Sequence, residues 1–182
     1  SSAQTSAPQR LYEDGLAREA RLRDELGRHN PSEEPTSLLR GIRTLVDAYE
    51  RMSREFPAGG YMDNALWQGD LALGLDAIGS LSLQGGDVDA ARAAFGEALS
   101  IRRALSEATP DAPAAQADLV MGLYNASLAA QRPTALHHLN EALDILDRLD
   151  RRGHLTADQQ AWPAAVRERI ALLQRQGSPE TD

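Results

Sequence analysis

The sequence contains no cysteine, which excludes disulfide bonds, thiolate metal sites and cysteine nucleophiles. Aromatic residues make up only 4% of the 182 residues, so a core must be built mainly from aliphatic side chains. Basic residues are outnumbered 19 to 27 by acidic ones, and the net charge of −8 opposes binding to nucleic-acid phosphates. No apolar run approaches the roughly 20 residues of a membrane helix. Neither nucleic acid nor membrane insertion is therefore expected.

Sequence motifs of catalysis are also missing. His137 and His138 are adjacent, so on a helix they point about 100° apart and cannot chelate one metal. The sequence has no His-Glu-x-x-His, no Gly-x-Ser-x-Gly elbow and no glycine-rich phosphate loop. We therefore predict a protein that is not an enzyme, with no catalytic residue, no metal and no cofactor.

Ala and Leu are abundant and β-branched residues scarce, which favours helix over strand. Proline and glycine clusters divide the chain into stretches of helical periodicity. The expected helices span 8–28, 36–56, 62–84, 88–108, 114–131, 133–152 and 157–175, with disordered tails at 1–7 and 176–182. Ser6, Thr36, Asp87 and Thr156 are suitable N-caps. Pro163 either kinks the last helix or places its true start just after Trp162.

An internal repeat indicates how these helices are organised. Asp70-Leu71-Ala72-Leu73-Gly74-Leu75 recurs 48 residues later as Asp118-Leu119-Val120-Met121-Gly122-Leu123. Phe95-Gly96-Glu97-Ala98-Leu99 recurs 44 residues later as Leu139-Asn140-Glu141-Ala142-Leu143. The difference between the two offsets lies in the turn between the helices. A helix pair whose length changes only in its turn is typical of stacked helical hairpins.

The repeated pair resembles the tetratricopeptide repeat. Leu75, Ile78 and Gly79 match the family's first-helix positions, and Ala91, Phe95 and Ala98 match the small–large–small ridge of its second helix. The long second helices are similar to those of kinesin light chains and many bacterial signalling proteins. The resemblance implies an all-α right-handed superhelix over residues 8–155, closed by a capping helix at 156–175.

Two finer resemblances point to different bacterial lineages. The stretch from Tyr12 to Gln68 resembles the repeat region of some bacterial N-acetylmuramoyl-L-alanine amidases, which are envelope proteins. The stretch from Asp70 to Leu173 resembles repeat arrays attached to caspase-like signalling domains. The expected location is accordingly either the bacterial cytoplasm or the periplasm and cell envelope, and the sequence leaves both open.

In tetratricopeptide arrays the first helices line a concave groove that holds the partner. The resemblance places the following residues in this groove: Leu73, Asp76, Ser80, Leu83, Met121, Tyr124, Asn125, Leu128 and Gln131. The family's Lys/Asn/Arg clamp for carboxylates is absent, because Asp76 and Tyr124 occupy its leading positions. The lining is mostly apolar with one acid, which suits an apolar or basic segment. The alternative is that Leu73, Leu83, Met121 and Leu128 are core residues.

Two hypotheses of function follow. The first is a non-catalytic interaction module, or scaffold, that binds a partner polypeptide in the concave groove. The second is a structural region that positions or oligomerises an attached catalytic domain, either a cell-wall amidase or a caspase-like protein. Trp67 and Trp162 are each either a binding anchor or a residue packed between helices, and we expect Trp162 to pack the capping helix onto the preceding pair.

Overall fold

The computed structural model describes residues 17, 18, 20–22, 24, 25, 28, 36–55 and 64–176. All regular structure among these residues is helical, which confirms the prediction of an all-α protein. The predicted tails, most of the helix at 8–28 and much of the amidase-like stretch lie outside the described residues. The chain forms two compact units, residues 1–94 and 95–182, and each is described by itself.

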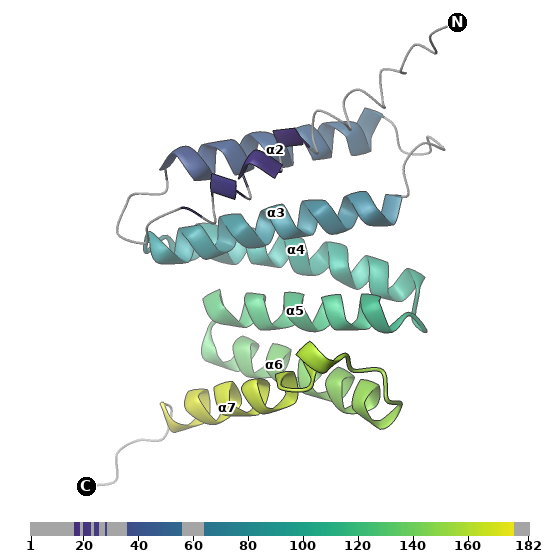
Figure 1. Ribbon diagram of the computed structural model, residues 1–182. Coiled ribbons are helices and arrows are strands. Elements are labelled where there is room, and N and C mark those ends of the chain that lie inside the picture. Colours follow the sequence, from purple (N-terminus) through teal and green to yellow (C-terminus); the bar gives the residue numbers. More distant parts are fainter. Residues whose placement is uncertain are drawn as a thin grey trace, which may run out of the picture. The chain divides into compact units, whose positions relative to one another are not determined.

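The helices and their bounds are as follows: α2 Thr36–Glu55, α3 Asn64–Gln84, α4 Val88–Ala108, α5 Pro113–Ala129, α6 Arg132–Arg151, a 3-10 turn η1 at Ala157–Gln159, and α7 Trp162–Arg175 (Figure 1). Helices α2 to α6 begin and end within two residues of the predicted positions. Two predicted boundaries were wrong in ways that matter for the site, the start of the last helix and the end of α5.

The predicted helix 157–175 is two elements. Residues 157–159 form only the 3-10 turn η1, and α7 begins at Trp162 with Pro163 in its first turn. Proline is tolerated there because the first N–H groups of a helix have no intrahelical acceptor. The second interpretation of Pro163, a helix start just after Trp162, is therefore confirmed to within one residue.

The predicted helix 114–131 ends two residues early, at Ala129. Pro133 explains this end, because it has no N–H to donate to the Ala129 carbonyl and its ring would clash with that carbonyl. Gln131 consequently has an extended backbone and occupies the N-cap position of α6. Gln131 therefore lies outside the helix to which the sequence assigned it.

The first unit is built on the contact between α2 and α3. Its buried apolar residues are Ile42, Leu45 and Val46 from α2, Leu71, Ala72, Leu75, Ile78 and Leu81 from α3, and Ala91 and Ala94 from the start of α4. Gly74 lies at the crossing, since a Cβ there would stand 3.4 Å from the Cγ2 of Val46. Leu75, Ile78, Gly79 and Ala91, which the repeat register predicts to pack, are all buried.

A tight turn joins α3 to α4. Gly86 adopts a φ of 81°, a conformation that favours glycine, and the Asp87 N–H donates to the Ser82 carbonyl at 2.8 Å. Asp87 then caps α4, because its Oδ1 accepts a hydrogen bond from the Ala90 N–H at 3.0 Å. The predicted N-cap at Asp87 is confirmed.

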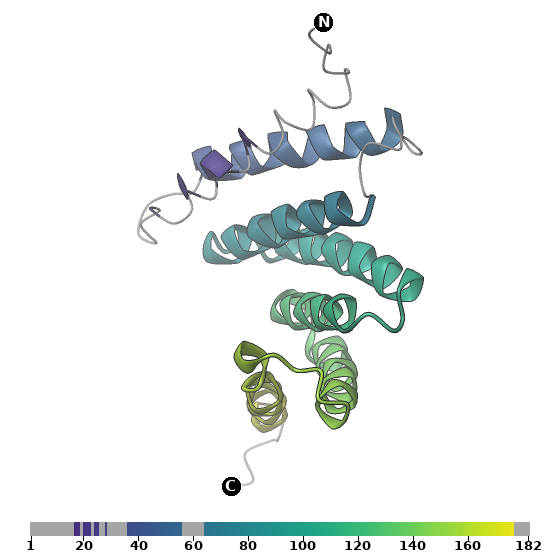
Figure 2. The same cartoon turned by 45° about the vertical axis from the view of Figure 1, so that its right-hand side comes forward.

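The second unit contains the later part of α4 and the helices α5, α6 and α7. Figure 2 looks nearly along α6 and α7 and shows them side by side beneath α5. The most deeply buried side chains of this unit are Phe95, Leu123, Ser127, Leu139 and Leu146. Ala98, Ala135 and Ala142 are also buried, at positions where the repeat register predicts small residues. Close helix contact at small residues is what ridge-into-groove packing requires.

Polar side chains connect the helices of the second unit. Arg103 of α4 donates two hydrogen bonds of 2.6 Å to the two carboxylate oxygens of Glu141 in α6. Gln116 at the start of α5 donates to the Ser106 hydroxyl at 2.8 Å. Arg167 of α7 pairs with Asp147 of α6 at 2.9 Å. These contacts link α4 to α6, α5 to α4 and α7 to α6.

Candidate functional site

The nine residues predicted to face a groove fall in both units. Leu73, Asp76, Ser80 and Leu83 belong to α3 in the first unit. Leu73 is 52% exposed and Ser80 is exposed, whereas Asp76 and Leu83 are half-buried. Leu73 is thus not a core residue, contrary to the alternative interpretation of the sequence.

The remaining five predicted residues belong to the second unit. Met121 is 40% exposed, while Tyr124, Asn125 and Leu128 are half-buried along α5. Gln131 is exposed beyond the end of this helix. Of these five residues, Met121 and Tyr124 line a cavity between α5 and α7.

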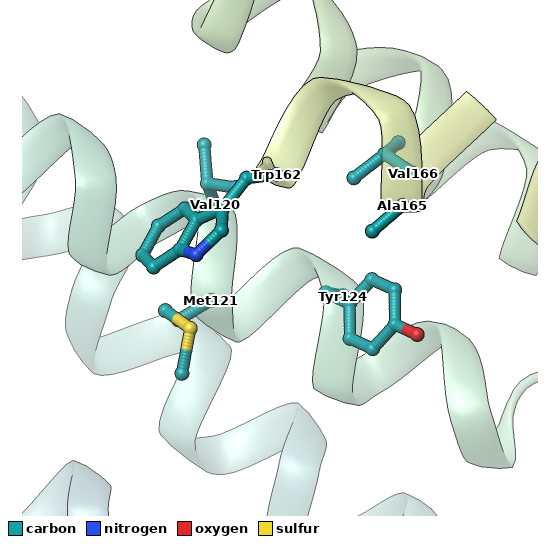
Figure 3. A pocket seen from close by; sticks show the side chains of 6 residues that line it. All are labelled: Val120, Met121, Tyr124, Trp162, Ala165 and Val166. Atoms are coloured by element: carbon teal, nitrogen blue, oxygen red, sulfur yellow. The ribbon is translucent and has the colours of Figure 1, made fainter. Parts of the chain in front are cut away.

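This cavity, here called the α5–α7 pocket, has a volume of about 270 Å³. Its lining residues are Val120, Met121 and Tyr124 from α5 and Trp162, Ala165 and Val166 from α7. Figure 3 shows Met121 beside the indole of Trp162 at one end, and Tyr124 facing Ala165 and Val166 at the other. The wall is therefore made of two aromatic rings, a thioether and aliphatic groups.

The sequence of α5 explains why it can form such a wall. Its 17 residues include a single charged one, Asp118, so the helix is apolar on nearly all sides. An all-round apolar helix must be covered on several faces by neighbours. At the crossing with α4, a Cβ on Gly122 would stand 3.0 Å from the Cδ of Arg102 and 3.4 Å from the Cδ1 of Leu99. This close approach turns Met121 and Tyr124 away from α4 and toward α7.

The other wall depends on how α7 is anchored. The Thr156 N–H donates to the Gln159 side-chain oxygen at 3.1 Å, which fixes the turn before the helix. Val166 and Leu173 are buried on the inner face of α7, and Arg167 is tied to Asp147 on the side of α6. Trp162 and Ala165 then lie on the remaining inner edge of the helix, where they face α5.

For Trp162 the sequence left two alternatives open, a binding anchor and a residue packed between helices, and its position has features of both. It is half-buried on the inner side of the last helix, and its indole also lines the pocket. The predicted contact of α7 with the preceding helix pair is confirmed through α6. Nothing is described of the Trp67 side chain, whose backbone lies in α3.

Sequence reasoning missed Val120, Ala165 and Val166 as lining residues. Val120 could have been predicted, because it directly precedes Met121 in the repeated segment and lies one helical turn before Tyr124. Ala165 and Val166 carried no such signal, since α7 has no counterpart in the repeat.

A second group of polar residues surrounds His138, on the face of α6 that meets α4. Burial and the positive charges of Arg103 and His137 lower the pKa of His138, and Glu141 acts in the opposite direction. The His138 Nδ1 is buried and has no hydrogen-bond partner among the described residues. The Arg103 guanidinium lowers the pKa of Glu141, while that residue raises the pKa of Arg103. This group is a structural connection between helices that contains one unsatisfied imidazole.

The protein is expected to lose stability as the pH falls through the histidine range. The lowered pKa of His138 means that the folded state binds this proton less readily than the unfolded state does. Stability is therefore complete above the ordinary histidine pKa of about 6.5 and decreases as the pH falls toward the lowered value. Melting temperatures at roughly pH 7.5 and pH 5.5, either side of that ordinary value, measure the effect.

The matched variant is His138→Gln, which keeps a polar side chain but cannot gain a proton. Its melting temperature should change less between the two pH values than that of the wild-type protein. An equal change in both proteins would show that another group is responsible.

Two further observations concern metal binding and membrane spanning. The described ranges contain no group of three His, Asp or Glu side chains placed to hold a metal ion. Among the helices from α2 to α7, none has the length and hydrophobicity needed to cross a bilayer. The α5–α7 pocket presents apolar side chains to a ligand.

A scan against protein-family models and a search of the curated proteins both found no match to this chain.

Proposed function

We propose that this chain is a tetratricopeptide-type interaction module that binds a partner polypeptide without chemistry, and that the α5–α7 pocket is its docking point. The observation that supports the proposal is an open, apolar cavity whose lining includes Met121, a residue left 40% exposed beside Trp162. Trp and Tyr are enriched among residues that dominate binding energy, and Met adapts to varied apolar ligands.

The size of the pocket favours a side chain over a complete small molecule. Its volume of about 270 Å³ lies below the roughly 300–1,000 Å³ that is usual for small-molecule sites. It exceeds the roughly 150 Å³ cavity that accommodates benzene in an engineered core. One large apolar side chain, or two adjacent ones, would fill it.

The repeat pattern supports the same proposal independently. Leu73 in α3 and Met121 in α5 occupy equivalent positions of the repeated segment, 48 residues apart, and both are exposed. In the tetratricopeptide family this position faces the ligand. An exposed large apolar residue at this register in each unit suits a position that contacts a ligand.

Ala165→Phe is expected to block binding without disturbing the core. Ala165 is exposed at the edge of α7 and lines the pocket, so a phenyl ring there would occupy the space of the ligand. Peptides selected from a random display library on the immobilised wild-type protein should share a large apolar residue. Their affinity for Ala165→Phe should fall by about tenfold or more, as for loss of an anchoring contact.

Ala164→Phe is the matched control, because Ala164 is also exposed on α7 but lies outside the pocket lining. It adds the same ring to the neighbouring helical position, about 100° around the axis. Selected peptides should bind it as they bind the wild-type protein. Peptides that bind both variants equally well would contradict the proposal.

A further inference from the structure

Arg169 lies on the side of α7 that also carries Trp162 and Val166, and its Nε has no hydrogen-bond partner among the described residues. The residue is half-buried, and its Nε is inaccessible to solvent. A buried guanidinium donor without a partner is costly, so native structures seldom retain one without a reason.

The helix register places Arg169 beside the pocket. It follows Trp162 by seven residues and Ala165 by four, so it shares the face of α7 that contributes to the α5–α7 pocket. It stands about 6 Å further along the helix axis than Ala165. Helical side chains lean toward the N-terminus, which directs a long arginine back toward the pocket.

No carboxylate of α7 is spaced to pair with it. The residues three and four positions away on either side of Arg169 are Ala165, Val166, Leu172 and Leu173, and all are apolar. Glu168 is the adjacent residue and points about 100° around the helix. The neighbouring cation, Arg167, has its partner in Asp147 of α6.

The one acidic residue of α5 is Asp118, which lies near Arg102 of α4. Desolvation raises the pKa of Asp118, and the positive charge of Arg102 in α4 opposes that rise. Asp118 therefore has a cation inside the fold, near the crossing of α4 and α5. On the side of α7 that contributes Trp162, Ala165 and Val166 to the pocket, the charged residue is Arg169.

We infer that the segment bound at the α5–α7 pocket is an amphipathic helix that carries a large apolar side chain for the pocket and a Glu or Asp about one turn away for Arg169. This inference rests on the proposed function and adds the chemistry of the partner. A helix suits the geometry, because side chains four residues apart are separated by about 6 Å along its axis. Guanidinium pairs with carboxylate through charge-assisted, often bidentate hydrogen bonds.

This partner differs in charge from the one that the sequence predicted. The expectation of a basic segment rested on Asp76, which lies in α3 of the first unit. The second unit offers an apolar pocket and an arginine instead, which favours an acidic partner there.

The test uses three synthetic helical peptides of about 15 residues, near the shortest length at which an isolated helix is stable. Each presents an apolar stripe centred on one Leu and differs only at the position four residues after it, which is Glu, Gln or Lys. A second set places the variable residue four positions before Leu, to allow either direction of the bound helix. Titration to millimolar concentration is followed by NMR of the Trp162 indole N–H and the Arg169 Nε–H.

The Glu peptide should bind about tenfold more tightly than the Lys peptide in one of the two sets, and it should shift the Arg169 Nε–H resonance. Arg169→Met should abolish the preference and melt no lower than the wild-type protein, because an unsatisfied donor is removed. Arg169→Glu should reverse the preference in favour of Lys.

Equal binding of Glu and Lys peptides, or a preference that persists in Arg169→Met, would overturn the inference. The proposed function would still stand if Ala165→Phe blocked binding and Ala164→Phe did not. If no peptide moves the Trp162 indole resonance at millimolar concentration, both the inference and the proposed function fail.

Discussion

Phe95→Ala is expected to lower the free energy of unfolding by about 3–5 kcal/mol, the usual cost of removing a fully buried phenyl ring. Phe95 is only 1% exposed, so its replacement by Ala would leave a cavity in the core. Small residues border it one turn away in α4, at Ala91 and Ala98, and both are completely buried. Chemical denaturation followed by circular dichroism measures the change.

Val88→Ala provides the comparison, because Val88 lies in the same helix α4 and is 44% exposed. This change should alter the free energy of unfolding by no more than about 0.5 kcal/mol, as is usual for surface positions. A similar small effect for Phe95→Ala would mean that its ring is not part of the core.

Two helical glycines are expected to respond to substitution in opposite directions. A Cβ at Gly122 would stand 3.0 Å from the Cδ of Arg102, which is tighter than ordinary contact, whereas a Cβ at Gly96 would meet no atom within 4 Å. Gly122→Val should destabilise the protein by about 1–3 kcal/mol through overpacking at the crossing of α4 and α5. Gly96→Ala should stabilise it by about 0.5–1 kcal/mol, because alanine favours the helix.

Both values come from the same denaturation measurement. If Gly122→Val were as stable as the wild-type protein, the Arg102 side chain would have to move aside without cost. That result would contradict the role of this crossing in turning Met121 toward α7.

The helices and much of the core could be predicted from sequence because each depends on local chemistry. Glycine and proline mark the turns around Gly86 and Pro133, and the spacing of small and large residues identifies Ala91, Phe95 and Ala98 as packed positions. Burial of these residues is confirmed. The identity of the family and the binding function remain predictions.

The pocket could be predicted only in part. Met121 and Tyr124 were found because α5 repeats the pattern of α3, whereas α7 repeats nothing in the sequence. The residues that α7 contributes to the pocket depend on where Pro163 allows α7 to begin and on which face of α7 packs against α6. Asn125 and Leu128 were predicted to face the groove from the repeat register alone. The pocket beside Trp162 is instead lined by an earlier part of α5, at Val120, Met121 and Tyr124.

The dependence of the pocket on α7 has a consequence for its dynamics. One wall belongs to α5, many of whose residues are buried, and the other to α7, whose buried residues are Val166 and Leu173 and whose ion pair with Asp147 is exposed. A helix that buries few side chains can open by local unfolding at a smaller free-energy cost than the whole domain. Fraying of α7 would therefore dismantle the pocket while α5 and α6 remained folded. A bound segment that spans both walls would slow amide hydrogen exchange in α7 first, and its residence time would be limited by the opening of that one helix.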